Sequence, residues 1–271
     1  MSDKGDIPTD ALKKEIAAFA MEEGAEAIGV ASVYDLLEAG LPEGRRPWDI
    51  LPGAQTILSF FLMGIETPRV TRKDNEWIRG TAEHSINFVL LGSGWPGATQ
   101  ADLLAYKIAR LLIRRGFKSI PIPSGHPYDK INLRGIISQK HAAVSAGLGE
   151  IGLNQLLLTP QCGSQSYPGA LLTTAHLEPD SKREARLCPE TQKICDLACV
   201  KACPVSAIKE DGRFDKKACL KFLYEVIGKE FGYQYYQHIL RCGVCMNVCP
   251  AGENNVKGAV EGGGGDIDHF P

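Results

Sequence analysis

The cysteines of this chain have the types and spacing of metal ligands. The sequence holds nine cysteines, and all but Cys162 fall between residues 188 and 249. In chain order these are Cys188, Cys195, Cys199, Cys203, Cys219, Cys242, Cys245 and Cys249, and a proline follows both Cys203 and Cys249. Thiolates bind iron–sulfur clusters and zinc, and a [4Fe–4S] cluster takes four of them. Eight thiolates therefore predict two such clusters and transfer of single electrons.

The two proline-terminated runs resemble the ligand runs of two-cluster ferredoxins. In those proteins the last cysteine of each run binds the other cluster, so the resemblance implies two crossed sets. Cluster one would take Cys188, Cys195, Cys199 and Cys249. Cluster two would take Cys203, Cys219, Cys242 and Cys245. The first run is irregular, because gaps of six and three residues replace the usual two. The assignment of Cys188 as a ligand is the one that this irregularity weakens most.

Two other uses of the cysteines were weighed against clusters. Two four-cysteine zinc sites would also use eight thiolates, but zinc does not explain the repeated Cys-Pro step or the interleaved spacing. Disulfides belong to oxidising compartments and mostly to small secreted chains. We therefore expect iron–sulfur clusters, and we expect cluster assembly to be coupled to folding of this segment.

The composition is that of an ordinary globular protein. The chain has 271 residues, a net charge of −2, 44% hydrophobic residues and 23% charged residues. No apolar run is long enough to span a bilayer, and the first residues, MSDKGDIPTD, contain neither a signal-peptide core nor a twin-arginine motif. These features predict a cytoplasmic protein with no membrane partner.

Apolar periodicity and breakers predict alternating helices and strands before residue 180. The expected helices are Ala11–Glu23, Glu76–Leu91, Gln100–Arg115 and Gly135–Ala146. The expected strands are Ala27–Ala31, Gln55–Met63, Lys118–Pro123 and Ala170–Thr174. Two further helices, Lys216–Ile227 and Tyr233–Ile239, are expected to wrap the clusters.

A charged stretch, EPDSKREAR at 178–186, predicts a boundary between two modules. We expect one domain over residues 1–180 and a cluster domain over 181–252. Residues 253–271 contain four consecutive glycines and are expected to form a flexible tail.

A second motif lies just before the cysteines. Residues 145–160 read SAGLGEIGLNQLLLTP, and LLTTAHLEPD follows at 171–180. Together with the Cys-Pro runs, this pattern resembles the shared core of the epoxyqueuosine reductase and reductive dehalogenase family. The resemblance covers roughly residues 10–252. It implies an α/β fold, an α+β sandwich similar to flavin nitroreductases and cobalamin-processing enzymes, followed by a two-cluster ferredoxin-like module. It also implies a corrinoid, cobalamin, beside the clusters.

Glycines of this motif lack a Cβ, so backbone could approach a planar cofactor there. We expect a cofactor site formed by Lys140, His141, Gly147, Leu148, Gly149, Gly152, Asn154 and Ser164. A helix C-cap at Gly147 followed by a tight turn explains the glycines without any ligand. The segment also fits GxGxxG, but a dinucleotide site needs a strand before it and a helix after it. Here a helix precedes and a strand-like run follows, which excludes that site.

The chain departs from the family pattern at the proton donor. Epoxyqueuosine reductases carry an acid shortly before the glycine motif, where this chain has Asn132, Leu133 and Arg134. Asp129 is near but out of position. Reductive dehalogenases use a tyrosine beside a basic residue, so the resemblance implies Tyr128, with Lys130 or Arg134, as the catalytic group. The family's helical-repeat extension, which grips tRNA, is also missing, and both departures argue against tRNA as a partner.

A few residues have alternative roles that the sequence leaves open. Cys162 is expected to be a buried, inert thiol, although it could face the cofactor. His84 and His126, like His141, have no partner at a spacing that predicts ligation.

These patterns favour an iron–sulfur oxidoreductase. Low-potential electrons from a ferredoxin or flavodoxin would pass through two [4Fe–4S] clusters to a corrinoid that reduces a small substrate. The alternatives are an electron-transfer protein without a substrate of its own, and a binding module whose first domain holds a flavin or nothing.

Overall fold

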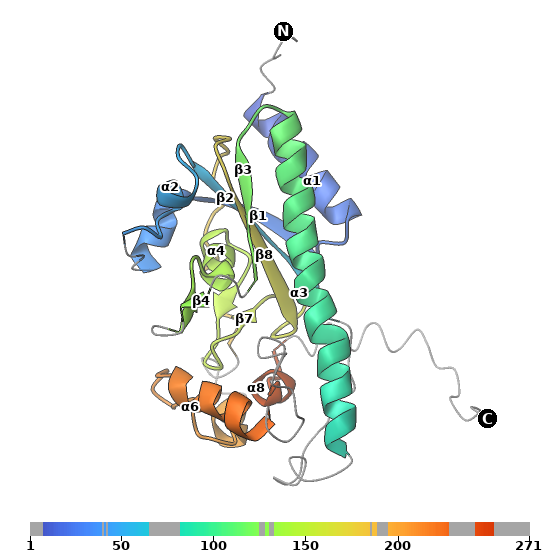
Figure 1. Cartoon of the computed structure of the whole chain (residues 1–271), viewed down its shortest axis with the longest axis vertical. Coiled ribbons are helices and arrows are strands. Elements are labelled where there is room, and N and C mark those ends of the chain that lie inside the picture. Colours follow the sequence, from blue (N-terminus) through green and yellow to red (C-terminus); the bar gives the residue numbers. More distant parts are fainter. Residues whose placement is uncertain are drawn as a thin grey trace, which may run out of the picture.

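Helices cover both faces of a four-stranded sheet, and the cysteine segment lies beyond one end of that sheet (Figure 1). The computed structural model describes residues 8–39, 41, 43–64, 82–124, 128–129, 133–184, 186–188, 195–227 and 242–251. The elements in chain order are α1 (Thr9–Glu22), β1 (Ala27–Ser32), η1 (Val33–Ala39), α2 (Pro47–Ile50), β2 (Thr56–Met63), α3 (Ala82–Arg114), β3 (Ser119–Ile122), β4 (Tyr128–Asp129), β5 (Arg134–Gly135), α4 (Gln139–Ser145), β6 (Glu150–Ile151), β7 (Leu157–Leu158), β8 (Ser166–Thr173), α5 (Ala198–Ala202), α6 (Lys216–Lys221), η4 (Phe222–Ile227) and α8 (Val244–Asn247).

The sheet has the order β1-β2-β8-β3, and its strand pairs are antiparallel. Side chains alternate between the two faces of a strand, and β2 is apolar on both. Leu58 and Phe60 pack with α1 and α3 on one face. Ile57 and Phe61 belong to the clusters on the opposite face, where α4 and η1 lie. The continuous apolar run of β2 therefore reflects burial between two helical layers.

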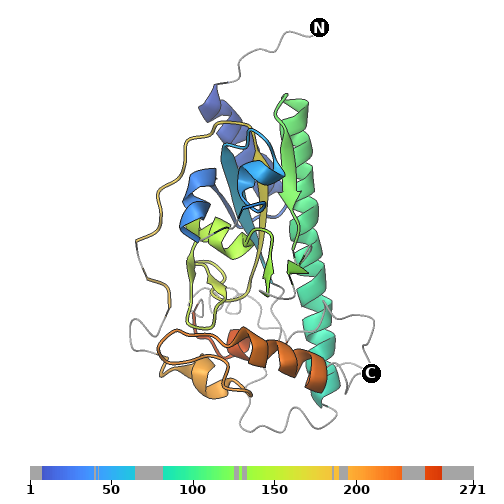
Figure 2. The same ribbon diagram turned by 60° about the vertical axis from the view of Figure 1, so that its left-hand side comes forward.

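The segment that leads from β8 to the cysteines is tied along the edge strand β1. The Val30 N–H donates to the Asp180 carboxylate at 2.8 Å, and the Asp180 N–H donates to the Val30 carbonyl at 2.9 Å. Lys13 of α1 forms an ion pair with Asp180 at 2.6 Å. Figure 2 shows this segment, in gold, descending the side of the molecule toward the cysteines. These contacts cover an exposed sheet edge and set the path of the chain into the second half.

The long helix α3 differs from the two helices expected around the GSGWPGA segment. The structure has a single helix, Ala82–Arg114, that contains Pro96. The expected break was wrong because tertiary packing overrides local propensity here. A Cβ on Gly97 would come within 2.6 Å of the Tyr167 ring, so this glycine lets the helix lie directly against β8. The residues before Ala82 in the expected helix Glu76–Leu91 lie outside the described part of the chain.

The other elements agree with the sequence in kind and differ in length. The helix expected at Gly135–Ala146 begins only at Gln139, because Gly135 pairs with Tyr128 in a short two-stranded sheet. Strand β8 begins at Ser166, four residues earlier than expected. The expected helix Lys216–Ile227 is an α-helix that continues as a π-helix, and Tyr233–Ile239 lies outside the described residues. No described helix has the length and apolarity to cross a bilayer.

Candidate functional site

One set of four cysteines surrounds a small cavity beside the β6–β7 hairpin. Cys188, Cys195, Cys199 and Cys249 line it, together with Leu153, Asn154, Leu158, Ala198 and Pro250. Leucine, alanine and proline side chains close this small cavity around the four cysteines. The pKa of Cys199 is raised to about 11, first by burial and then by the nearby thiols of Cys249, Cys195 and Cys188. Iron must therefore displace protons from these thiols.

The cysteines of the second set lie close enough to one another to shift each other's pKa values. Burial raises the pKa of Cys245 to about 12, and Cys242 and Cys219 contribute next, followed by smaller effects of Cys199 and Cys203. The pKa of Cys219 is raised by burial and by Cys203. The first set is grouped around one cavity as the crossed pattern predicts. Cys245 lies near Cys242, Cys219 and Cys203 but also near Cys199 of the first set, and the identity of each ligand stays a prediction.

The thiols do not converge on one point. Among the described residues, no three His, Cys, Asp or Glu side chains are gathered closely enough to hold a single metal ion. A [4Fe–4S] cluster instead takes one thiolate on each iron, so its ligands stand around a cavity. The first cysteine set has this arrangement.

Two buried polar residues from the first half hold the last cysteine run in place. The Asn154 amide donates to the Cys245 carbonyl at 3.2 Å, and the Ser164 hydroxyl donates to the Met246 carbonyl at 3.0 Å. Each residue is only 4% exposed. These contacts differ from the expected bonds to cofactor amides, since they anchor the cysteine segment to the β6–β8 region.

A carboxylate of β6 fixes the first cysteine. The Glu150 side chain accepts a hydrogen bond from the Cys188 N–H at 2.6 Å, and its other oxygen lies 3.7 Å from Arg186. The irregular spacing around Cys188 is thus accompanied by a specific anchor. No sequence pattern pointed to Glu150 as an anchor, although it lies within the AGLGEIG motif.

The motif glycines pack against the protein itself. A Cβ would come within 2.3 Å of the Ser181 carbonyl oxygen at Gly147 and within 2.1 Å of the Leu158 carbonyl oxygen at Gly149. At Gly152 it would meet the Leu158 side chain at 2.6 Å. Leu148 is buried in the core beside α4. Close backbone packing therefore accounts for these residues, and the alternative that needs no ligand fits the glycines better than a cofactor cradle.

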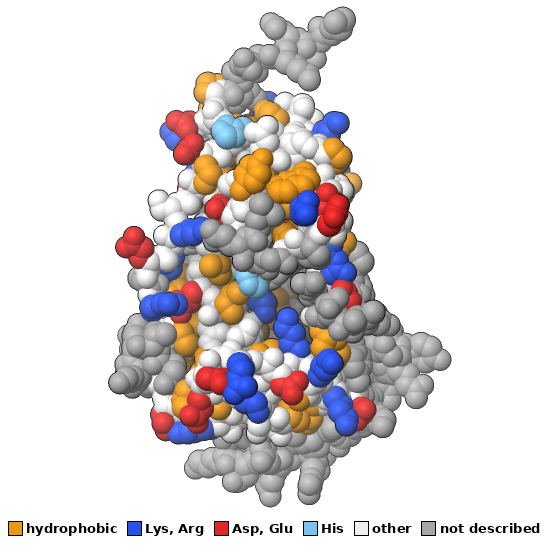
Figure 3. All heavy atoms as spheres, turned by 90° about the vertical axis from the view of Figure 1, so that its left-hand side faces the viewer, with side chains coloured by type: hydrophobic (Ala, Val, Ile, Leu, Met, Phe, Trp, Pro, Cys, Tyr) orange, Lys and Arg blue, Asp and Glu red, His pale blue; other side chains and the backbone are white. Residues whose placement is uncertain are grey.

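The large cavity of the described structure lies between the two halves of the chain. Its volume is about 640 Å³, within the range of cofactor sites. Figure 3 views this face, where a hollow is edged by Lys or Arg side chains and one His. The lining residues are Leu36, Leu41, Arg45, Pro123, Leu133, Gly135, Ile136, Ile137, Ser138, Gln139, Lys140, His141, Ile151, Gln155, Pro168, Phe214, Lys216, Cys219, Leu220 and Leu223.

Of the expected cofactor residues, Lys140 and His141 line this cavity, and the glycines, Leu148, Asn154 and Ser164 do not. Both basic residues lie in α4, whose N-cap Ser138 accepts from the His141 N–H. Desolvation lowers the pKa of Lys140, and the charge of Lys216 lowers it further. The pKa of His141 is lowered by burial, then by Lys140 and Lys216. The cavity wall is therefore crowded with positive charge.

The expected catalytic residues are only partly described. Tyr128 and Arg134 lie on the paired strands β4 and β5, next to the cavity-lining Leu133 and Gly135. Their side chains, and all of Lys130, lie outside what the structure describes. Asp129 accepts from the Arg45 guanidinium at 2.6 Å. Arg45 lines the cavity, and nothing in the sequence pointed to it.

Cys162 does not line the cavity. Cys162 is buried beside Phe61 and Leu157, and burial raises its pKa to about 11, which agrees with an inert thiol. The side chain of His84 and all of His126 are not described.

The comparisons with known proteins agree with this geometry. A family described as "4Fe-4S double cluster binding domain" matches residues 185–252. The chain is 35% identical over 121 residues to an epoxyqueuosine reductase of Listeria monocytogenes, covering 43% of this chain and 30% of that protein. It is 30% identical over 265 residues to the Bacillus subtilis enzyme, covering 88% of this chain and 63% of the relative. The chain thus spans less than two thirds of these relatives.

Solved structures show the same fold. An epoxyqueuosine reductase in complex with an epoxyqueuosine-modified tRNA-Tyr stem loop has a TM-score of 0.55 at 21% identity, covering 92% of this chain and 67% of that one. A reductive dehalogenase, described as B12-dependent, has a TM-score of 0.55 at 17% identity, covering 96% of this chain and 35% of that one. The predicted fold class is confirmed.

These findings correct one expectation. The argument against tRNA as a partner was wrong, because the relatives are epoxyqueuosine reductases and one structural neighbour holds a modified tRNA stem loop. A missing acid at one position was too weak a signal to exclude a whole class of partner. The resemblance drawn from the sequence is confirmed: a [4Fe–4S] double-cluster domain matches residues 185–252, the curated relatives are epoxyqueuosine reductases, and the fold is that of solved epoxyqueuosine reductases and reductive dehalogenases.

Proposed function

We propose that the chain is an iron–sulfur reductase whose two [4Fe–4S] clusters deliver electrons to a corrinoid in the 640 Å³ cavity. The observation that carries this proposal is the position of Cys219. It belongs to the second cysteine set and also lines the cavity. An electron on that cluster would therefore have a short path to a bound cofactor.

The division of labour follows the two expected domains. Residues 1–180 supply α4 and most of the side chains that line the cavity, and residues 181–252 supply the cysteines, Lys216, Leu220 and Leu223. Asn154 and Ser164 keep the last cysteine run against the first domain. These bonds would keep the clusters close to the cavity.

The cavity fits a large, partly apolar cofactor. Its wall combines branched apolar side chains such as Ile136, Ile137 and Leu223 with amide and hydroxyl groups of Gln139 and Ser138. A cobalamin is larger than 640 Å³, so it would lie partly outside this cavity and leave the wall at Lys140 and Lys216 to the substrate. When bound, a corrinoid supplies a cobalt centre that takes up low-potential electrons and attacks a carbon–oxygen or carbon–halogen bond.

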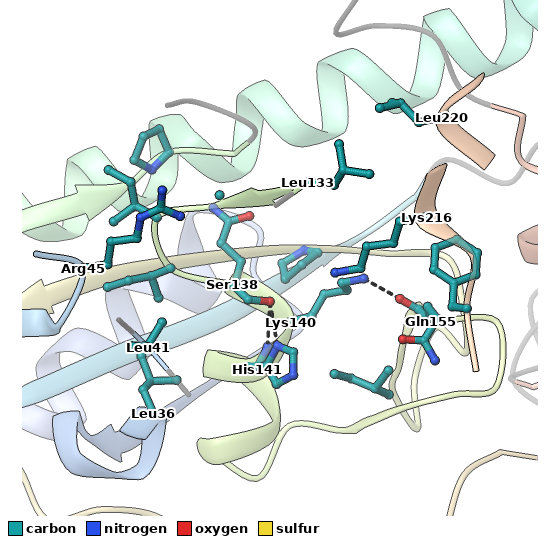
Figure 4. Close-up of a pocket in the computed structure, with 18 of the residues that line it drawn as sticks. Leu36, Leu41, Arg45, Leu133, Ser138, Lys140, His141, Gln155, Lys216 and Leu220 are labelled. Atoms are coloured by element: carbon teal, nitrogen blue, oxygen red, sulfur yellow. Dashed lines mark hydrogen bonds between the residues drawn. The ribbon is translucent and has the colours of Figure 1, made fainter. Parts of the chain in front are cut away.

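The substrate is proposed only by class. Epoxyqueuosine carried on tRNA is the first compound to test, because relatives are named for it. Leu133, one of the three residues at the position of the family's acid, lines the cavity with an apolar side chain (Figure 4). Another group must then deliver the proton, and Tyr128 with Lys130 or Arg134 remains our candidate.

A second candidate function is electron transfer without a substrate. The apolar Leu133 at the cavity wall favours it, since no carboxylate of the described lining residues can act as an acid there. In this case the two clusters would serve another redox protein.

Cobalamin binding separates the two functions. Cobalamin is titrated into anaerobically reconstituted protein and followed by calorimetry and absorbance. We expect saturable binding to wild type and loss of binding in Ile136→Trp, which fills the cavity, with unchanged iron content. Ile120→Trp is the matched control, because Ile120 is 38% exposed and does not line the cavity. Absence of binding to wild type would leave electron transfer as the function.

A further inference from the structure

We infer that the cavity binds an oxyanion of the substrate, a carboxylate or a phosphate, between Lys140 and Lys216. This inference deepens the proposed function and rests on it. The two lysines come from different halves of the chain, α4 and α6. Figure 4 shows their ammonium ends side by side at the cavity wall.

The two lysines have no carboxylate partner in the described part of the protein, and the group that offsets the charge of Lys140 there is the Cys245 thiol. Arg45, at the other end of the cavity in Figure 4, is paired with Asp129 at 2.6 Å. Lys140 and Lys216 form no ion pair with any described residue, and no Asp or Glu is among the described lining residues. Two like charges held side by side repel each other, and an anion bound between them would reduce that repulsion.

Lys140 is also held in position. Its ammonium group donates to the Gln155 carbonyl (Figure 4). Gln155 has φ = 61°, a left-handed conformation that is uncommon for a residue other than glycine. Its side chain donates to the Gly212 carbonyl at 3.5 Å. A strained residue therefore aims the lysine, which is typical of functional positions.

His141 adds a third polar group on the same wall. It lies next to Lys140 in α4, and its ring nitrogen is 2.9 Å from the Ser138 hydroxyl. A planar carboxylate or a phosphate can accept hydrogen bonds from several such donors at once, and charge-assisted bonds of this kind are the strong ones. Cys219 lines the same cavity, so a substrate held here would lie close to the source of electrons.

The test uses protein with its iron–sulfur clusters and without corrinoid, and inorganic phosphate or acetate as the probe. Binding is measured at constant ionic strength by calorimetry and by broadening of the ³¹P signal near the paramagnetic clusters. We expect saturable binding that weakens about tenfold or more in Lys140→Gln and in Lys216→Gln. Lys217→Gln is the matched control, because Lys217 is exposed and adjacent in α6 but does not line the cavity.

Three results would overturn the inference. The first is no saturable binding of either anion to wild type. The second is an equal loss in Lys217→Gln, which would indicate general surface attraction. The third is an unchanged anion affinity in Lys140→Gln and Lys216→Gln with a shifted potential of the cluster, which would make the lysines counter-ions of the thiolates.

A final arm identifies the source of the oxyanion, since cobalamin carries a phosphodiester of its own. Phosphate that still binds to cobalamin-loaded protein is the result expected for a substrate group. Phosphate that competes with cobalamin but not with cobinamide, which lacks the phosphodiester, would assign the lysines to the cofactor and overturn the substrate assignment. Phosphate binding without any corrinoid binding would sustain the anion site and remove the proposed function.

Discussion

The two cysteine sets have surroundings of opposite character. The first set is enclosed by Leu153 and Leu158, and the carboxylate of Glu150 is bonded to the Cys188 N–H. The second set borders an open cavity, with Lys140 and Lys216 on its wall. Net charge and hydrogen bonding around a cluster set its reduction potential. A nearby anion lowers that potential and a nearby cation raises it, so the difference favours electron flow from the first set to the second.

The largest expected effect comes from breaking one set alone. Cys203→Ala should remove the cluster of Cys219, Cys242 and Cys245 and keep the cluster of its sequence neighbours, Cys195 and Cys199. About half of the iron should be lost, since each [4Fe–4S] cluster needs four thiolates. EPR of the reduced variant checks this. Loss of the Cys195 and Cys199 signal with the other intact would mean that the sets are not crossed.

A second variant tests the packing that supports the first set. In Gly149→Val the new Cβ would lie 2.1 Å from the Leu158 carbonyl oxygen, and Leu158 lines the first thiol cavity. We expect a loss of stability of about 3 kcal/mol or more, with loss of iron. Gly135→Ala is the control, because its Cβ would have an ordinary contact at 3.7 Å. A stable, iron-replete Gly149→Val protein would revive the glycine motif as a ligand site.

A milder variant loosens the anchor of the last cysteine run. Ser164→Ala leaves the Met246 carbonyl without its hydrogen bond, at a cost of about 1–3 kcal/mol. Clusters should be released to a chelator faster than from wild type. Ser119→Ala, which removes a bond to Thr173 far from the cysteines, should leave the release rate unchanged. If clusters are released to the chelator at the same rate from both variants, the Ser164 hydrogen bond does not stabilise the clusters.

The smallest expected effect concerns the charge difference itself. Glu150→Gln keeps a hydrogen-bond acceptor for the Cys188 N–H and removes the negative charge. The potential of the first cluster should rise by an amount on the order of tens of millivolts, while the second changes less. An EPR-monitored redox titration measures both. If the reduction potential rose only in the second cluster, Glu150 would lie closer to that cluster in effect. The proposed order of electron flow would then be contradicted.

The crossed cysteine sets stay a prediction, which the sequence allows because two proline-terminated runs resemble the ligand runs of two-cluster ferredoxins. The structure places Cys188, Cys195, Cys199 and Cys249 around one cavity. The strands β1 and β2 were also predictable, since a buried strand is a continuous apolar run. The cavity was not, because it is assembled from distant segments. Only Lys140 and His141 were anticipated there, while Arg45 and Lys216 have no motif of their own.

The glycine motif marks the other limit of the sequence. A glycine allows close approach of either a cofactor or a neighbouring backbone, and the sequence pattern is the same in both cases. At Gly147 and Gly149 the neighbours are the carbonyls of Ser181 and Leu158, which only the fold brings close. Asn154 and Ser164 were likewise noticed for their polarity, but their partners, Cys245 and Met246, lie more than 80 positions away.

The central claim, two [4Fe–4S] clusters on eight cysteines, is tested most directly by metal and sulfide analysis. Protein reconstituted anaerobically with iron and sulfide, freed of excess reagent and quantified by amino-acid analysis, should contain about eight iron and about eight sulfide per chain. Zinc should be far below stoichiometric. About four iron per chain, or stoichiometric zinc with little sulfide, would contradict the account.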